Sequence, residues 1–179
     1  MEYQRIISFW FEQSEAKDWF QKNSQYDQKI IELFSDVHRA ASMGELVDWR
    51  NSALGALAEI IVLDQFSRNM FRDQARAFAY DGMALILSQE AIAQNKHAGL
   101  SATQKAFLYM PFMHSESKAI HQRAVELFSE PGLENNLDFE LKHKKIIDRF
   151  GRYPHRNKLL NRTSTAEEID FLKQPGSSF

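Results

Sequence analysis

Apolar residues recur at helical spacing along most of the chain, and this pattern predicts an all-helical protein. The clearest segment runs over residues 52–65, where apolar residues such as Leu57, Ile60 and Ile61 occupy most sides of the predicted helix. A helix that is apolar on most sides is typical of a buried, central position. We find no alternating strand pattern of useful length, and with 7 Gly and 4 Pro the chain is poor in turn residues.

Helix-start signals place the other elements. Ser101 and Thr165 each begin a pattern with capping-box spacing, Ser24 is predicted to cap a helix, and Pro111 is predicted to interrupt or kink the chain. We find no linker between two cores, so we expect a single domain over residues 1–179, built from antiparallel helix pairs with short connections. The predicted helices cover residues 3–11, 15–22, 24 to shortly before Gly44, 52–65, 74–93, 114–128, 137–150 and 165–173, with one more after Ser101.

The composition fits a folded domain of this kind. Hydrophobic residues make up 44% and charged residues 26%, and there are 14 Phe. The absence of Cys excludes a disulfide framework, a thiolate metal site and a Cys nucleophile. The N-terminus does not have the pattern of a signal peptide, and the apolar stretches are far shorter than the roughly 20 residues of a membrane helix. We therefore expect a cytoplasmic protein that does not act at a membrane.

Charge is unevenly distributed along the chain. The net charge is −2, yet residues 142–162 contain eight Lys or Arg and only one acid, Asp148. That segment carries +7 and the remainder carries −9. Such asymmetry often indicates an anionic partner.

The first candidate segment is residues 63–81, where Asp64, Arg68, Arg72 and Arg76 follow one another at steps of four. Asp64 and Arg68 can pair on a helix. Three arginines at this spacing would repel one another unless acids or a bound anion offset their charge. On a helix, each step of four residues also rotates the side-chain direction by about 40°, so these four side chains cannot all share one face. A break in the helix near Asn69 is an equal alternative.

The second candidate segment is residues 109–121, which contains His114 and His121 in an aromatic, Met-rich stretch. Seven residues separate them, which lacks the spacing of a helical zinc motif. We interpret His114 as a helix-start residue that bonds Glu116 or a backbone group, with metal binding disfavoured.

The third candidate segment is residues 143–165, where a turn around Pro154 brings arginines and histidines together. Arginine suits bidentate binding of carboxylate or phosphate, and histidine titrates near neutral pH. The alternative is that these side chains bond carboxylates of their own fold. Nucleic acid is disfavoured, because the pI is about 6.3 and no nucleic-acid motif is found. The motifs GxxxxGK[ST], GxGxxG, GxSxG and HExxH are also absent, and we expect no cofactor.

Taken together, the strings LDQFSRNMFR, RAFAYD, FLYMPFMHSE and IIDRFGRYPHRNKLLNRTST resemble a bacterial family known as domain of unknown function 924. The resemblance covers nearly the whole chain, with one departure at Ser67, where members often have Pro. It implies an all-α fold similar to tetratricopeptide-repeat superhelices, and it implies no reaction.

Three functions are compatible with these observations. The first is a site between helices for a small phosphate or carboxylate ligand, with a histidine as acid or base. The second is a tetratricopeptide-repeat-like scaffold for an acidic peptide, and the third is a purely structural network. Guanidinium groups scattered over the fold, each paired with its own carboxylate, would contradict the first; the oligomeric state is open. The candidate residues are His114, His143 and His155 for catalysis, and Asp64, Arg68, Arg72, Arg76, Arg149, Arg152, Arg156 and Asn157 for ligand binding.

Overall fold

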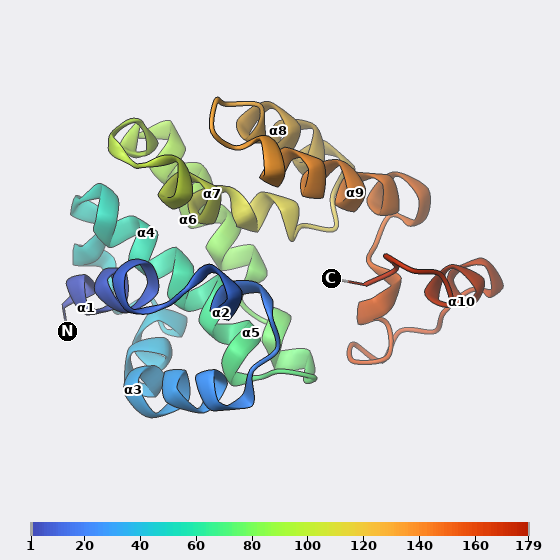
Figure 1. Cartoon of the computed structure of the whole chain (residues 1–179), viewed down its shortest axis with the longest axis horizontal. Coiled ribbons are helices and arrows are strands. Elements are labelled where there is room, and N and C mark those ends of the chain that lie inside the picture. Colours follow the sequence, from blue (N-terminus) through green and yellow to red (C-terminus); the bar gives the residue numbers. More distant parts are fainter. Residues whose placement is uncertain (1, 179) are drawn as a thin grey trace.

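The helix α4 is the buried centre of the fold. In the computed structural model, which describes residues 2–178, α1 (Tyr3–Ser8) continues into a π-helical turn, η1 (Phe9–Gln13). Next come α2 (Ala16–Phe20), α3 (Ser24–Ser42), the 3-10 turn η2 (Val47–Asn51) and α4 (Ala53–Ile61). The α4 residues from Gly55 to Ile61 are all buried, and α1, α6 and α7 pack against this helix (Figure 1). The apolar pattern therefore predicts the central helix correctly.

The α4 helix continues beyond Ile61 through a π-helical turn. This turn, η3 (Val62–Phe66), leads into α5 (Ser67–Met70) with helical backbone angles throughout. A π-helical turn changes the local register, so side chains beyond it leave the directions that a four-residue repeat would give. The helix ends at Met70, which agrees with a break near Asn69. Asp73 then adopts a left-handed conformation with φ 61°.

The second half of the chain contains four successive helices of 11 to 17 residues. After the 3-10 turn η4 (Ala75–Phe78) come α6 (Asp81–Ala93), the turn η5 (Lys96–Gly99), α7 (Ala102–Met113), α8 (Lys118–Phe128) and α9 (Glu134–Phe150). Each helix from α6 to α9 packs on the next one. The predicted helix start at residue 74 is wrong, because a 3-10 turn precedes α6 there. Pro111 lies inside α7 and does not end it.

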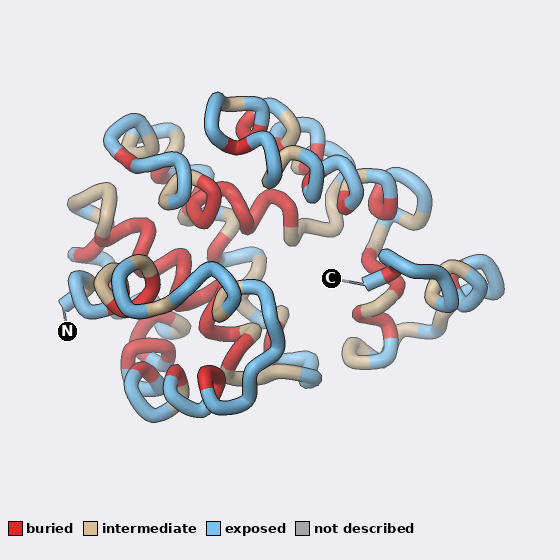
Figure 2. The backbone as a smooth tube through the Cα atoms, in the orientation of Figure 1, coloured by how far each residue is buried: buried red, intermediate tan, exposed pale blue. Residues whose placement is uncertain are grey.

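The C-terminal segment leaves α9 at Gly151, which has φ 69°. The turn η6 (Pro154–Arg156) and the helix α10 (Ala166–Leu172) follow, at the red end of the chain in Figure 1. A small apolar cluster of Ile146, Ile147 and Tyr153 lies here, and the main core spans the rest of the chain. Figure 2 shows buried residues concentrated along α4 and α7.

Helix caps follow the sequence signals in most places. Both predicted capping boxes, at Ser101 and at Thr165, are present. At α3 the cap is Asn23, whose side chain accepts hydrogen bonds from two backbone N–H groups, so the prediction of Ser24 is wrong by one residue. His114 ends α7 and does not begin the next helix.

Within residues 2–178 there is no β-strand, which confirms the all-α class. A superhelix of the tetratricopeptide-repeat type stays a prediction. In the same part of the chain, no helix combines the length and apolar character needed to cross a bilayer.

Candidate functional site

Five charged or titratable side chains from the three candidate segments converge where η3, α5, α6, α7 and η6 meet. We call this set the inner cluster. It joins helix ends and turns that lie far apart in the sequence, and most of its contacts are hydrogen-bonded ion pairs. Its members are Asp64, Arg68, Asp81, His114 and Arg156.

Asp64 is the most buried acid of the inner cluster, with 1% of its surface exposed. One carboxylate oxygen, Oδ1, accepts from His114 Nδ1 at 2.7 Å and lies 3.2 Å from Arg68 Nη1. The amide of Gln65 donates to the other oxygen. Burial alone would raise the pKa of Asp64, but Arg68 and His114 outweigh it and hold the pKa well below its usual range. Asp64 is therefore ionised at neutral pH.

Arg68 is compensated by two carboxylates. Its guanidinium donates to both oxygens of Asp81, at 2.9 and 3.0 Å, and to the backbone carbonyl of Asp64 at 2.8 Å. Burial lowers the pKa of Arg68, but Asp64 and Asp81 more than offset it and raise the pKa. Arg68 thus has its charge and its hydrogen bonds satisfied within the fold.

Arg156 is in a different position. It is 6% exposed, and its guanidinium lies over the rings of Phe78 and Tyr153 at 4.5 and 4.6 Å. Its one ion pair is a long contact of 3.3 Å from Nη1 to Asp81, and its buried Nε has no hydrogen-bond partner among the described residues. Burial and the nearby Arg68 lower the pKa of Arg156. The charge of Arg156 is therefore compensated less completely than that of Arg68.

Three histidines surround the ring of Tyr153. The ring centroids of His121, His143 and His155 lie 6.3, 5.7 and 5.4 Å from it. The Tyr153 hydroxyl donates to the Met113 carbonyl at 2.6 Å, which ties the C-terminal segment to the end of α7. Burial lowers the pKa of His143 to about 3 and, together with Arg156, that of His155 to about 4. Both imidazoles are neutral at pH 7.

A second buried pair lies beside Tyr153. His121 Nδ1 is 2.6 Å from Glu140 Oε1, both side chains are fully buried, and His121 Nε2 is 2.8 Å from the Ser115 carbonyl. Burial raises the pKa of Glu140. Glu140 is not among the residues predicted from the sequence, where its only signal is its position one helical turn before His143. His121 does not share a helix face with His114, because a turn separates α7 from α8.

The remaining candidate arginines lie outside the inner cluster. Arg72 makes two bonds to Asp27, at 2.6 and 2.7 Å, and Arg152 makes two to Glu168, at 2.7 and 2.8 Å. Each of these two arginines is paired with a carboxylate of the fold, as expected of a structural network. Of the candidate arginines within residues 2–178, Arg68 and Arg156 are the two that lie in the inner cluster. The other polar candidates also lie outside the inner cluster: Arg149 binds Glu167, Arg76 stacks 4.1 Å over Phe71, and Asn157 bonds Ser164 and Glu168. Arg162, which is not among the candidate residues, binds Glu116.

His114 also differs from its interpretation. Its partner is Asp64 on another helix and not Glu116, which instead binds Arg162. Within residues 2–178, no group of three or more His, Asp or Glu side chains has the arrangement of a metal site.

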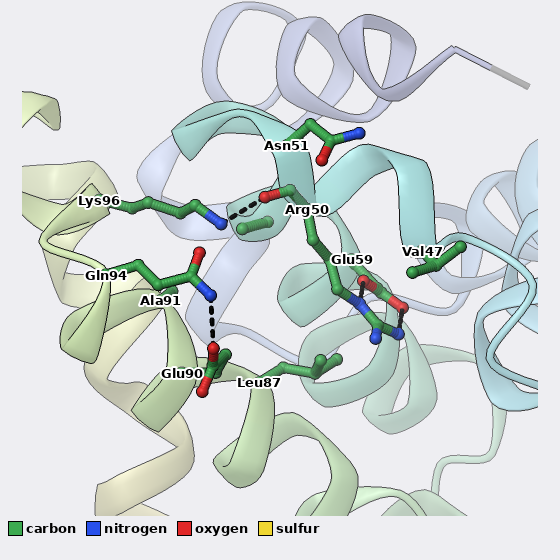
Figure 3. A pocket seen from close by; sticks show the side chains of 10 residues that line it. Val47, Arg50, Asn51, Glu59, Leu87, Glu90, Ala91, Gln94 and Lys96 are labelled. Carbon is green, nitrogen blue, oxygen red and sulfur yellow. Dashed lines mark hydrogen bonds and ion pairs between the residues drawn. The ribbon is translucent and has the colours of Figure 1, made fainter.

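Two cavities lie elsewhere on the molecule. One of about 400 Å³ lies between η2, α4, α6 and η5, where Arg50 forms two 2.7 Å bonds with Glu59 and Lys96 donates to the Arg50 carbonyl (Figure 3). The other, of about 360 Å³, is lined by Lys17, Asp18 and residues 21–25. Neither is lined by a member of the inner cluster, and in the first cavity the main charged groups already have partners.

The fold and the inner cluster together define an all-helical protein with a buried arginine, carboxylate and histidine network. The chain belongs to a bacterial family of proteins of unknown function, DUF924, whose model matches residues 6–176. It is similar to a solved structure of a protein of unknown function from Agrobacterium tumefaciens, with 37% identity, 96% of each chain covered and a TM-score of 0.91. No curated protein matches the chain.

Proposed function

We propose that the chain binds a small anionic molecule, through a carboxylate or phosphate group, at Arg156 on the edge of the inner cluster. The proposal rests on the incomplete compensation of the Arg156 guanidinium by acceptors of the fold. It is 6% exposed, shares the carboxylate of Asp81 with Arg68, and has an unpartnered Nε. A buried cation with incomplete compensation is costly, and an anionic ligand would relieve that cost.

Access and geometry support the same proposal. The side chains of Arg68, Asp81 and His114 are 21%, 16% and 15% exposed, so solvent reaches the cluster next to Arg156. A guanidinium with free N–H groups suits the two oxygens of a carboxylate or phosphate better than an ammonium does. The predicted cytoplasmic location and repeat-like superhelix are compatible with this function, although it depends on neither.

The test is a thermal-shift and calorimetric screen of phosphorylated and carboxylated metabolites, with inorganic phosphate as the minimal probe. A ligand that binds the native state at 100 times its Kd stabilises it by about 2.7 kcal/mol. We expect at least one anion to raise the melting temperature of the wild type and to lose this effect in Arg156→Gln.

Arg149→Gln is the matched control, because Arg149 is 47% exposed and pairs with Glu167, which is 62% exposed. This variant should retain the ligand effect. Arg156→Lys serves if the Gln variant does not fold, and it should bind more weakly because it loses the planar fork. If no anion stabilises the wild type, or if Arg149→Gln loses binding as fully as Arg156→Gln, the proposal is wrong.

A further inference from the structure

We infer that His114 is a proton acceptor, held by Asp64 with Nε2 free to take a proton from an O–H group. The reaction class would be general-base catalysis on a small anionic molecule. The substrate in this inference rests on the proposed function, since the anionic group would bind Arg156. The arrangement of His114 and Asp64 does not depend on that ligand.

The tautomer follows from the partners of Asp64. An ionised carboxylate accepts hydrogen bonds and donates none. The 2.7 Å contact between His114 Nδ1 and Asp64 Oδ1 therefore requires the proton on Nδ1. In a neutral imidazole, Nε2 then carries a lone pair. The carboxylate is itself fixed, because Arg68 and Gln65 bind it as well.

Nε2 of His114 is available for chemistry. Within residues 2–178 it makes no hydrogen bond, and the side chain is 15% exposed. Two other histidines of this region, His121 and His143, differ. Both ring nitrogens of His121 have partners and its side chain is fully buried, and His143 is 7% exposed. Of these three histidines, His114 is the one that combines an orienting carboxylate with an open nitrogen, the pairing that a general base requires.

The surrounding charges allow the ring to be neutral before the step and stabilised after it. Burial and Arg68 lower the pKa of His114, and Asp64 and Asp81 partly offset them. His143, the titratable group on α9 that interacts with His114, is neutral at pH 7. At neutral pH the imidazole accordingly has its lone pair.

The proposed step balances as a simple proton transfer. The O–H bond of the substrate, or of a water held beside it, breaks, and its electron pair stays on oxygen. The proton moves to Nε2, while the Nδ1 proton stays in its bond to Asp64. Asp64 is a positioning residue in this step, because it acts through His114 and does not touch the substrate.

Heteronuclear NMR of the imidazole nitrogens tests the inference without an assay. The His114 signals are assigned by their loss in His114→Gln. At pH 7 we expect a protonated Nδ1 and an unprotonated Nε2 in the wild type. A proton on Nε2, or a charged ring at this pH, would overturn the inference.

Asp64→Asn provides a signature that a merely structural role would not produce. The amide N–H of Asn can donate to Nδ1, so we expect the tautomer to switch and Nε2 to carry the proton. Carbethoxylation mapped by peptide mass should be fast at His114 in the wild type and at least tenfold slower in Asp64→Asn. An unchanged tautomer and an unchanged rate in a folded Asp64→Asn variant contradict the role of Asp64.

The two proposals fail in different ways. A Nδ1–H tautomer in a protein that no anion stabilises supports the proton acceptor and contradicts the anion site at Arg156. An anion that binds Arg156 while His114 has the opposite tautomer supports the site and contradicts the base. Where both hold, the bound anion should also protect His114 from carbethoxylation.

Discussion

At the scale of single residues, Asp81 is the carboxylate on which the inner cluster depends. It begins α6, accepts two hydrogen bonds from Arg68 of α5, and meets Arg156 of η6 at 3.3 Å. Both guanidinium groups are largely shielded from water, so their mutual repulsion is screened less than it would be on the surface. Asp81 therefore stabilises the fold and competes with any anionic ligand for the same donors.

Asp81→Asn should change stability and binding in opposite directions. Loss of the charge leaves two arginines undercompensated, and we expect the free energy of unfolding to fall by about 1–3 kcal/mol. The freed donors should make anions bind more tightly, so phosphate should restore part of the lost stability. Urea denaturation with and without phosphate measures both effects.

Asp170→Asn is the control for Asp81→Asn, because Asp170 is 72% exposed in its pair with Lys173. An exposed pair of this kind contributes at most about 1 kcal/mol, and this variant should show no phosphate rescue. Equal phosphate rescue in both variants would show that the effect does not come from the inner cluster.

At the scale of elements, the packing of α4 against η2 depends on a glycine. A Cβ built on Gly55 would lie 2.0 Å from the carbonyl oxygen of Trp49. The same corner contains the paired bonds from Arg50 to the buried Glu59. The backbone of η2 approaches α4 closely because no side chain intervenes there.

Gly55→Ala should be strongly destabilising for this reason. The clash is with backbone, which cannot move aside as a flexible side chain can, and we expect a loss of about 3 kcal/mol or more in the free energy of unfolding. Gly82→Ala in α6 is the matched control, since nothing lies within 4 Å of its added Cβ. It should stabilise by about 0.5–1 kcal/mol, since Ala is favoured over Gly in a helix. Thermal melts of both variants measure these changes in stability, and a similar change in melting temperature for both would contradict the expected clash at Gly55.

Some sequence signals are sufficient to place a helix or a cap, and other features of the fold have no such signal. Local signals place α4 and the capping boxes at Ser101 and Thr165, because periodicity and caps depend on neighbours in sequence. The π-helical turn at Val62–Phe66 and the 3-10 turn before α6 have no comparable local signal. The arginine partners are similarly remote: Arg72 binds Asp27, 45 residues away, so the sequence indicates the polar segments but not their pairs.

At the scale of the whole molecule, the charge asymmetry of the sequence is largely neutralised in the fold. Arg149, Arg152 and Arg162, all within the basic segment, bind Glu167, Glu168 and Glu116. The excess of basic residues in the linear sequence thus becomes a set of ion pairs that attach the C-terminal segment. The segment still contains the proposed anion site, because Arg156 belongs to it and is the incompletely compensated member.

Several buried histidines make stability depend on pH. Burial lowers the pKa of His38 to about 4 and of His143 to about 3, and burial with Arg156 lowers that of His155 to about 4. Above the unfolded value of about 6.5 both states are neutral. As the pH falls below 6.5, the unfolded chain binds protons that the folded chain does not. The free energy of unfolding should then decrease, down to the folded pKa values.

Each such histidine contributes a loss of up to about 1.4 kcal/mol per pH unit below 6.5. We expect urea denaturation between pH 7 and pH 5 to show this decline. His38 is 2% exposed and bonds Ser67 at 2.8 Å, so His38→Gln should lower stability at pH 7 and also make the decline shallower. An equal decline in wild type and variant would contradict a neutral, buried His38.

The sequence distance across the inner cluster has a consequence for the order of folding. Arg156 and Asp81 are 75 residues apart, and Tyr153 and Met113 are 40 apart. Closing loops of this size costs conformational entropy before the stabilising contacts form, whereas neighbouring helices are joined by short loops and lose less. The C-terminal segment is therefore expected to dock late in refolding and to open early in unfolding. Its backbone amides should exchange with deuterium sooner than those of α4. A ligand bound at Arg156 should therefore slow the opening of the C-terminal segment, which is the first step of unfolding.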